Sequence, residues 1–103
     1  MIRLEIGEKH KTVIVREDLE HAMVNQFSRV VEEELKKKDG LDVVIDLDGC
    51  NFMDSGNLGV ISQANRELTS RGRKLKLVNV RRGVWSTLEV TSLDKIMEIE
   101  RKE

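Results

Sequence analysis

The stretch Asp54-Ser55-Gly56 combines residue types that can build a reactive or modifiable site at the start of a helix. It follows an apolar segment and precedes a helical pattern, so either Asp54 or Ser55 can cap the helix with a side-chain oxygen. Gly56 and Gly59 leave bare backbone on two sides of the first turn, where another molecule could approach closely. The plain alternative is a helix cap with glycines for tight packing.

A second candidate for chemistry is the Asp-Leu-Asp-Gly sequence at residues 46–49, directly after an apolar run. It resembles the nucleophile motif of haloacid-dehalogenase phosphatases, in which one Asp attacks phosphorus and the second handles protons. Cys50 stands where that motif has threonine, and no later pair of acids indicates a magnesium site. We therefore expect no enzymatic activity and no cofactor.

The remaining metal-ligating residue types also fail to form a pattern. His10, His21 and Cys50 lack the spacing of zinc ligands, and residue 57, where a calcium loop would need glutamate, is Asn. A single cysteine excludes an internal disulfide and suits a reducing compartment. Because Cys50 lies between two apolar segments, we expect a buried small side chain there.

The periodicity of apolar residues predicts the elements that position these residues. Strands are predicted over residues 1–6, 12–15, 41–47 and 74–80, the third with both faces covered because Val43, Val44 and Ile45 follow one another. Helices are predicted from Met23 to about Lys38, from Ser55 to Ser70 and from Val84 to Val90. Residues 94–99 fit either a helix or a final strand. Phe52 and Met53 are expected in the core, and Trp85 is expected to pack the last helix against the sheet.

The order of these elements predicts an α/β fold, a mixed sheet of about four to five strands with helices packed on it. Helical crossovers imply partly parallel pairing with right-handed connections, and the initial hairpin makes the sheet mixed. The 103 residues suit one domain over 1–103, with no internal repeat and no proline-rich linker.

Charge and hydropathy exclude two classes of partner. Eighteen basic and nineteen acidic residues give a net charge of −1, without the basic excess of nucleic-acid binders, so we expect no direct nucleic-acid partner. The basic residues at 71–76 and 81–82 are interpreted as a solvated loop and strand edge. No apolar run is long enough for a membrane span, and charged residues interrupt the N-terminus. These features predict a cytoplasmic protein.

The segment from Val43 to Ile61 resembles the STAS family of anti-sigma-factor antagonists. The family's hallmark is an apolar strand ending in Asp-Leu, then an aromatic-aliphatic-Asp-Ser step, then Leu-Gly-Val. The corresponding residues are Val43–Leu47, Phe52-Met53-Asp54-Ser55 and Leu58-Gly59-Val60. The order of elements matches over nearly the whole chain, and residues 81–97 resemble the family's last helix. The resemblance implies a STAS-like fold.

The resemblance also implies a mechanism, in which Ser55 is phosphorylated by a GHKL-type serine kinase that is itself the anti-sigma factor. The unphosphorylated form binds this kinase, phosphorylation releases it, and a PP2C-type phosphatase reverses the modification. The implied partner-binding residues are Asp54, Gly56, Asn57, Leu58 and Gly59, with Glu20, or else Asp18, from the loop after the second strand. The plain alternative for the two loop acids is an acidic start to the first helix.

Simple electrostatics is consistent with such a switch. A phosphate adds roughly −1.5 to −2 charges, which the N-terminus of a helix accommodates but a docked protein does not. One departure concerns the residues after Ser55, because the family has a small residue and then glycine where this chain has Gly56 and then Asn57, a polar side chain expected beside Ser55. The alternative role is a non-phosphorylated scaffold or accessory subunit of a signalling or transport assembly, with Ser55 as a cap only.

Overall fold

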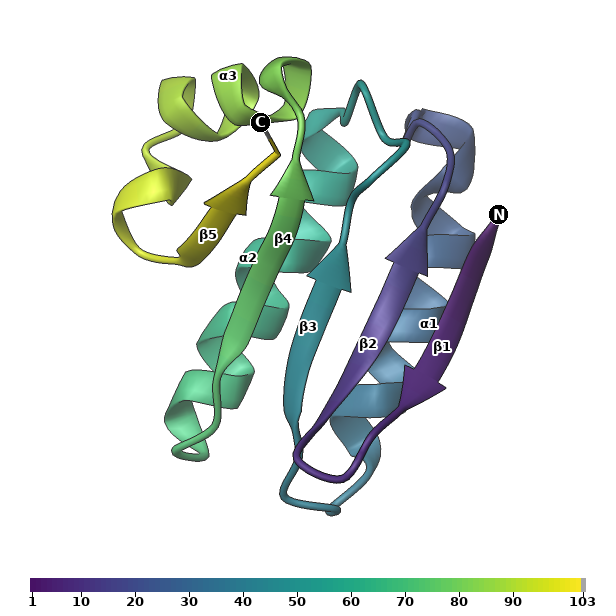
Figure 1. Cartoon of the computed structure of the whole chain (residues 1–103), viewed down its shortest axis with the longest axis vertical. Helices are drawn as coiled ribbons and strands as arrows, with labels where there is room; N and C mark the ends of the chain where they lie inside the picture. The colour runs from purple at the N-terminus through teal and green to yellow at the C-terminus, as the bar shows by residue number, and fades with distance from the viewer. Residues whose placement is uncertain (103) are drawn as a thin grey trace.

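The alternating apolar residues form a five-stranded sheet in the computed structural model, which describes residues 1–102 (Figure 1). The strands lie side by side in sequence order, with β1 antiparallel to β2 and the other neighbours parallel. Their bounds are β1 Ile2–Ile6, β2 His10–Val15, β3 Asp42–Asp46, β4 Leu75–Val80 and β5 Glu98–Arg101. The mixed sheet predicted from the sequence is confirmed.

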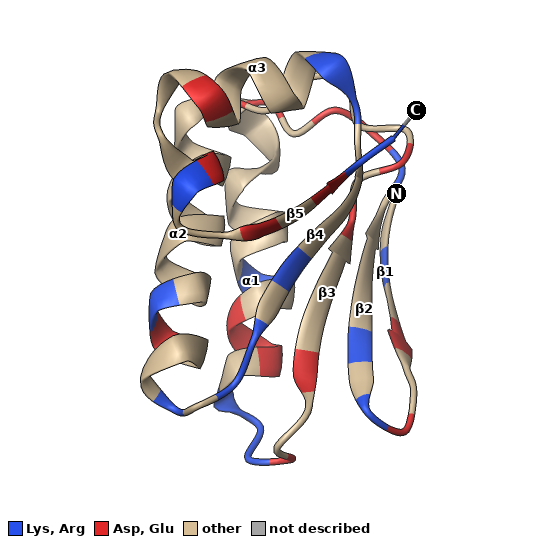
Figure 2. Ribbon diagram, turned by 60° about the vertical axis from the view of Figure 1, so that its left-hand side comes forward, with Lys and Arg blue, Asp and Glu red and all other residues tan. Residues whose placement is uncertain are grey.

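Two helices, α1 (Val24–Lys36) and α2 (Ser55–Ser70), cover one face of the sheet (Figures 1 and 2). A third, α3 (Arg82–Val90), lies at the end of the sheet where β4 finishes. Two short helical turns, η1 (His21–Met23) and η2 (Leu93–Lys95), precede α1 and β5. Within residues 1–102, each helix is too short or too polar to cross a membrane.

The core lies between the sheet and the two long helices. The strands contribute residues at every second position, such as Val13, Ile45 and Leu77, which lie in register across β2, β3 and β4 and are fully buried. The expectation that β3 is covered on both faces is wrong, because α1 and α2 occupy one side and Val44 on the other side is only half-buried. Figure 2 shows Lys and Arg interspersed with Asp and Glu over the molecule.

The C-terminal segment contains both of the elements that its sequence allowed. Residues 93–95 form η2, and residues 98–101 form the edge strand β5 beside β4. Trp85 of α3 packs against the core as expected, and the guanidinium carbon of Arg101 lies 4.7 Å from the centroid of its ring. The cation–π contact therefore ties β5 to α3.

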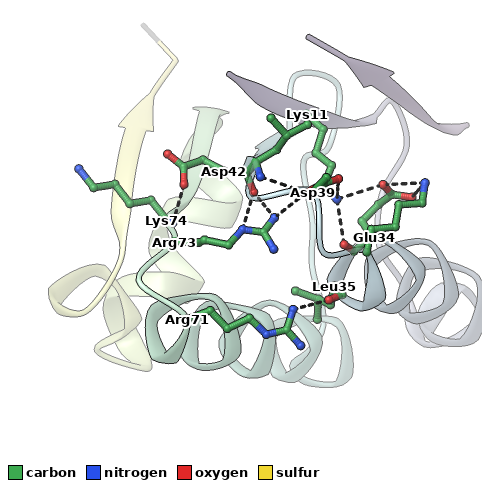
Figure 3. Close-up of polar contacts among 10 residues, drawn as sticks. Lys11, Glu34, Leu35, Asp39, Asp42, Arg71, Arg73 and Lys74 are labelled. Carbon is green, nitrogen blue, oxygen red and sulfur yellow. Dashed lines mark hydrogen bonds and ion pairs between the residues drawn. The ribbon is translucent and has the colours of Figure 1, made fainter. Parts of the chain in front are cut away.

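A buried ion cluster closes the end of the sheet at which β2 and β3 begin (Figure 3). Lys11 is fully buried, and its Nζ lies 2.9 Å from Asp39 Oδ2, 2.8 Å from the Glu34 carbonyl oxygen and 3.3 Å from Glu34 Oε1. Arg73, expected in a solvated loop, donates through Nε to the Leu41 carbonyl oxygen at 2.7 Å and lies 3.3 Å from Asp39 Oδ1. The cluster thus joins β2, the end of α1 and the loop that precedes β4.

This cluster predicts how stability depends on pH. The hydrogen bond from Lys11, followed by that from the Leu41 amide, holds the pKa of Asp39 below its ordinary value. A carboxyl group with a lowered folded-state pKa stabilises the protein above its ordinary pKa and loses that contribution as pH falls through the folded-state value. Asp39→Asn should therefore reduce the free energy of unfolding at pH 7, and its difference from wild type should shrink below about pH 4.

Urea denaturation at pH 7 and pH 3 measures this dependence. Glu33→Gln, which neutralises an exposed carboxylate of α1, is the matched control and should change stability little at either pH. A destabilisation by Asp39→Asn that is the same at both values would contradict the role given to the charge.

Candidate functional site

The site forms where the chain leaves β2 and β3, because adjacent parallel strands end at the same edge of the sheet. The two following loops pair with each other as a parallel bridge between Leu19 and Met53. The Leu19 amide donates to the Phe52 carbonyl oxygen at 2.9 Å, and the Asp54 amide donates to the Leu19 carbonyl oxygen at 3.0 Å. Since Leu19 and Met53 are buried in the core, both loops are fixed in place.

Asp54 is the N-cap of α2, which resolves the choice between Asp54 and Ser55. Its backbone is extended, and its Oδ1 accepts a hydrogen bond from the Asn57 amide at 3.0 Å. This bond, with the Asn57 side-chain amide and nearby His21, outweighs desolvation and lowers the pKa of Asp54. Ser55 is consequently the first helical residue, and it is exposed to solvent.

The glycines of the first turns have different surroundings. A Cβ on Gly56 would lie 3.0 Å from Val24 Cγ2, so this glycine allows α1 and α2 to approach each other. A Cβ on Gly59 would meet no atom within 4 Å, as far as residues 1–102 are concerned. Both glycines line a groove of about 430 Å³ between α1 and α2. Gly59 therefore leaves open space on the surface beyond Ser55.

Two expected contact residues lie inside the protein instead. Asn57 is 0% exposed and Leu58 is 4% exposed, so the expectation that their side chains contact a partner is corrected. The reason is helix geometry, since both residues lie on the face of α2 that continues with the buried Ile61. Asn57 thus lies beneath the loop that carries Glu20, to whose carbonyl oxygen its side chain donates.

Phe52 lies on the surface, so the expectation that it belongs to the core is wrong. Its side chain is 49% exposed, whereas Met53 is buried as expected. Because successive residues of an extended segment point to opposite sides, burial of Met53 directs Phe52 outward. The alternation was visible in the sequence, but which of the two residues faces the core was not.

The acidic residues of the β2 loop both lie at this edge of the sheet. Asp18 is exposed and accepts a hydrogen bond from the Asn51 amide at 2.8 Å, so it joins the two loops. Glu20 is exposed, and its backbone carbonyl oxygen lies 3.0 Å from Asn57 Nδ2. His21 follows with 94% of its side chain exposed and its Nδ1 3.9 Å from Asp54 Oδ2. The structure therefore brings Glu20 and the start of α2 together.

Asp46 and Asp48, the two acids of the segment that resembles a phosphatase motif, form ion pairs. Arg16 lies 3.1 Å from Asp46, while Arg81 and Lys102 lie 2.7 Å and 3.0 Å from Asp48. The bonds from Lys102 and Arg81 lower the pKa of Asp48. In the described part of the chain, no three His, Cys, Asp or Glu side chains are placed to hold a metal ion.

The loop between β3 and α2 is also fixed from its other side. Cys50 is buried as predicted, and burial raises the pKa of its thiol. Gly83, in the first turn of α3, passes so close to this loop that a Cβ would lie 2.3 Å from the Asn51 carbonyl oxygen. The glycine therefore permits α3 to support the loop that leads to Ser55.

Comparisons with known proteins confirm the expected STAS-like fold. The family model described as STAS domain matches residues 1–103. An anti-sigma F factor antagonist of Paenibacillus polymyxa is 26% identical over 100 residues, which cover 95% of this chain and 86% of that protein. The crystal structure of a candidate anti-sigma factor antagonist from Thermotoga maritima has a TM-score of 0.88 and 25% identity, covering 96% of this chain and 85% of that one. The structure of the Bacillus cell fate determinant SpoIIAA in its phosphorylated form has a TM-score of 0.76 and 18% identity, and the match covers 96% of this chain and 90% of that one.

Support of the site by α3 can be tested at Gly83. Gly83→Ala should lower the free energy of unfolding by roughly 1–3 kcal/mol, because the added methyl group overlaps the Asn51 carbonyl oxygen and forces a backbone shift. Ser86→Ala, at an exposed position of the same helix, should be close to neutral. Equal stability of Gly83→Ala and wild type in chemical denaturation would show that the loop moves freely away from α3.

Proposed function

This chain belongs to the STAS domain family, and we propose that it acts as an anti-sigma-factor antagonist in a partner-switching pathway. In its unphosphorylated form it binds a GHKL-type serine kinase that is also the anti-sigma factor. Phosphorylation of Ser55 releases the kinase, and a PP2C-type phosphatase restores binding. The observation that carries the proposal is an exposed serine at the first position of a capped helix, on a surface that is already formed. Partners of this kind imply a cytoplasmic location, which is part of the proposal.

The position of Ser55 supports a switch that acts by blocking the contact. A phosphate there would lie at the N-terminus of a 16-residue helix, where backbone amides and the helix dipole favour an anion. The domain itself can therefore keep its fold. A docked protein would have to bury a bulky, doubly charged group beside Asp54, which costs several kcal/mol unless that charge is paired.

The bare helix surface at Gly59 supports close approach by a partner. Glycine inside a helix costs about 1 kcal/mol relative to alanine, and no contact with the described residues requires the absence of a Cβ there. A partner backbone lying against α2 would provide the reason. Phe52, whose ring is half exposed near the cap, supplies the kind of aromatic anchor that dominates many interfaces.

Glu20 supplies a charged contact on the same surface. Its side chain is exposed, and its backbone is bonded through Asn57 to the first turn of α2, the turn that contains Ser55. A basic residue of the kinase is the expected counterpart. Among proteins of similar fold, SpoIIAA has been solved in a phosphorylated form, which supports the compatibility of this fold with a phosphate.

Phosphorylation itself is tested with a GHKL-type anti-sigma-factor kinase. Incubation with the kinase and Mg-ATP should add one phosphate to the wild type and none to Ser55→Ala, as measured by intact-protein mass spectrometry. Ser55→Asp should weaken kinase binding by at least tenfold, about 1.4 kcal/mol or more, while thermal stability stays nearly unchanged because the helix start tolerates a negative charge.

Three other outcomes would contradict this role of Ser55. Undiminished phosphate on Ser55→Ala would place the modification at another residue. An unmodified wild type that still binds the kinase would favour the alternative, a scaffold or accessory subunit of a signalling or transport assembly. A large loss of stability in Ser55→Asp would show that the serine is mainly structural.

Close approach is tested separately by adding a methyl group at Gly59. Gly59→Ala should raise the free energy of unfolding by about 1 kcal/mol, because alanine favours the helix and its methyl group meets open space. Kinase binding, measured by calorimetry, should nevertheless weaken. Thr69→Ala, at an exposed position near the far end of α2, is the control that should also favour the helix but leave binding unchanged. Wild-type affinity in Gly59→Ala would show that the kinase does not reach this turn.

A further inference from the structure

We propose that Asn57 is a positioning residue of this surface, whose buried side-chain amide locks the loop carrying Glu20 to the start of α2. Glu20 and Ser55 are then held at one fixed spacing before any partner arrives. This inference rests on the proposed function for the identity of the partner, but the lock itself is a property of the free protein. Asn57 acts from beneath the surface and touches no partner.

The hydrogen bonds of Asn57 join three segments. Its Nδ2 lies 2.9 Å from the Leu19 carbonyl oxygen, 3.0 Å from the Glu20 carbonyl oxygen and 2.8 Å from Asp54 Oδ1. Because an amide group has two hydrogens, the three acceptors share them. One side chain of α2 therefore holds two successive carbonyl groups of the β2 loop and also the capping carboxylate.

The burial of Asn57 argues against a role in stability alone. A buried amide stabilises a fold only when its polar atoms are paired, and Asn57 Oδ1 is buried without a hydrogen-bond partner among residues 1–102. An alanine would avoid this unpaired acceptor and would favour the helix more. The asparagine therefore accepts one unpaired oxygen in exchange for hydrogen bonds from its Nδ2, and the contact with the loop is what its side chain provides.

The loop needs such a contact at Glu20 in particular. The bridge between the two loops ends at Leu19, whose amide and carbonyl groups bond to the segment before α2. One residue further on, the Glu20 carbonyl oxygen accepts from the Met23 amide within its own turn and from Asn57 across the site. Asn57 is thus the link between α2 and the residue that carries the exposed carboxylate. A loop ordered in advance binds more tightly, because less freedom is lost on association.

Hydrogen exchange of the free protein tests the lock directly. In Asn57→Ala the amides of Leu19, Met23 and Asp54 should exchange roughly tenfold faster, the equivalent of about one hydrogen bond, while the amides of β3 keep their wild-type rates. Asn65→Ala is the matched control, since this side chain lies further along α2 and its Nδ2 is 3.4 Å from the Ile96 carbonyl oxygen. Unchanged exchange at the three amides in Asn57→Ala would overturn the proposal. Asn57→Ser, whose side chain is too short to reach both carbonyls, should behave like Asn57→Ala.

A double-mutant cycle tests positioning against a general loss of structure. Asn57→Ala should lower affinity for the kinase roughly tenfold, and this loss should be much smaller when Glu20 is already replaced in Glu20→Gln. Independent effects of the two substitutions would overturn the positioning role. Failure of the wild type to bind the kinase would instead contradict the proposed function, and the exchange measurement would still decide whether the lock exists.

Discussion

The pairing of the loops after β2 and β3 is the contact on which the site depends. Leu19 and Met53 are buried side by side, and the backbone hydrogen bonds between their segments set the path by which the chain enters α2. Because two apolar side chains anchor the pair, the polar residues between and beyond them are free to face solvent. Ser55 and Glu20 are exposed for this reason, although both lie one residue from buried or capping positions. The proposed switch would need no movement of the backbone.

The two ends of the sheet are held by separate sets of interactions. At the end where β2 and β3 begin, the fully buried Lys11 binds Glu34 and Asp39, so charges join the segments. At the end where these strands finish, backbone pairing and the Asn57 amide join the segments, together with the ion pairs Arg16–Asp46, Arg81–Asp48 and Lys102–Asp48. A new charge at Ser55 therefore arises at the end of the sheet away from the Lys11 cluster. This separation lets the proposed modification change the surface while the ion pairs of the Lys11 cluster keep their partners.

Local signals made part of this structure predictable from the sequence. The bounds of α2 follow from the capping acid at one end and Arg71-Gly72 at the other, and the observed helix has the predicted limits. The burial of individual side chains was harder to predict, because it depends on contacts between segments that are distant in the sequence. Lysine is seldom buried, so nothing local predicts burial of Lys11, and only the arrival of Glu34 and Asp39 makes its position favourable. Phe52 and Asn57 were misplaced because a sequence does not say which side of an extended segment, or which edge of a helix, meets the neighbouring loop.

The central claim is that phosphorylation of Ser55 changes the surface of a rigid site and leaves the fold as it is. Backbone amide NMR spectra of the unphosphorylated and phosphorylated chain test this most directly. The account predicts shifts confined to the start of α2 and the two paired loops, with the exchange protection of the Leu19 and Asp54 amides preserved. Shifts that extend through β3 and β4, or loss of protection at those two amides, would show that the phosphate acts by rearranging the domain and would contradict the account.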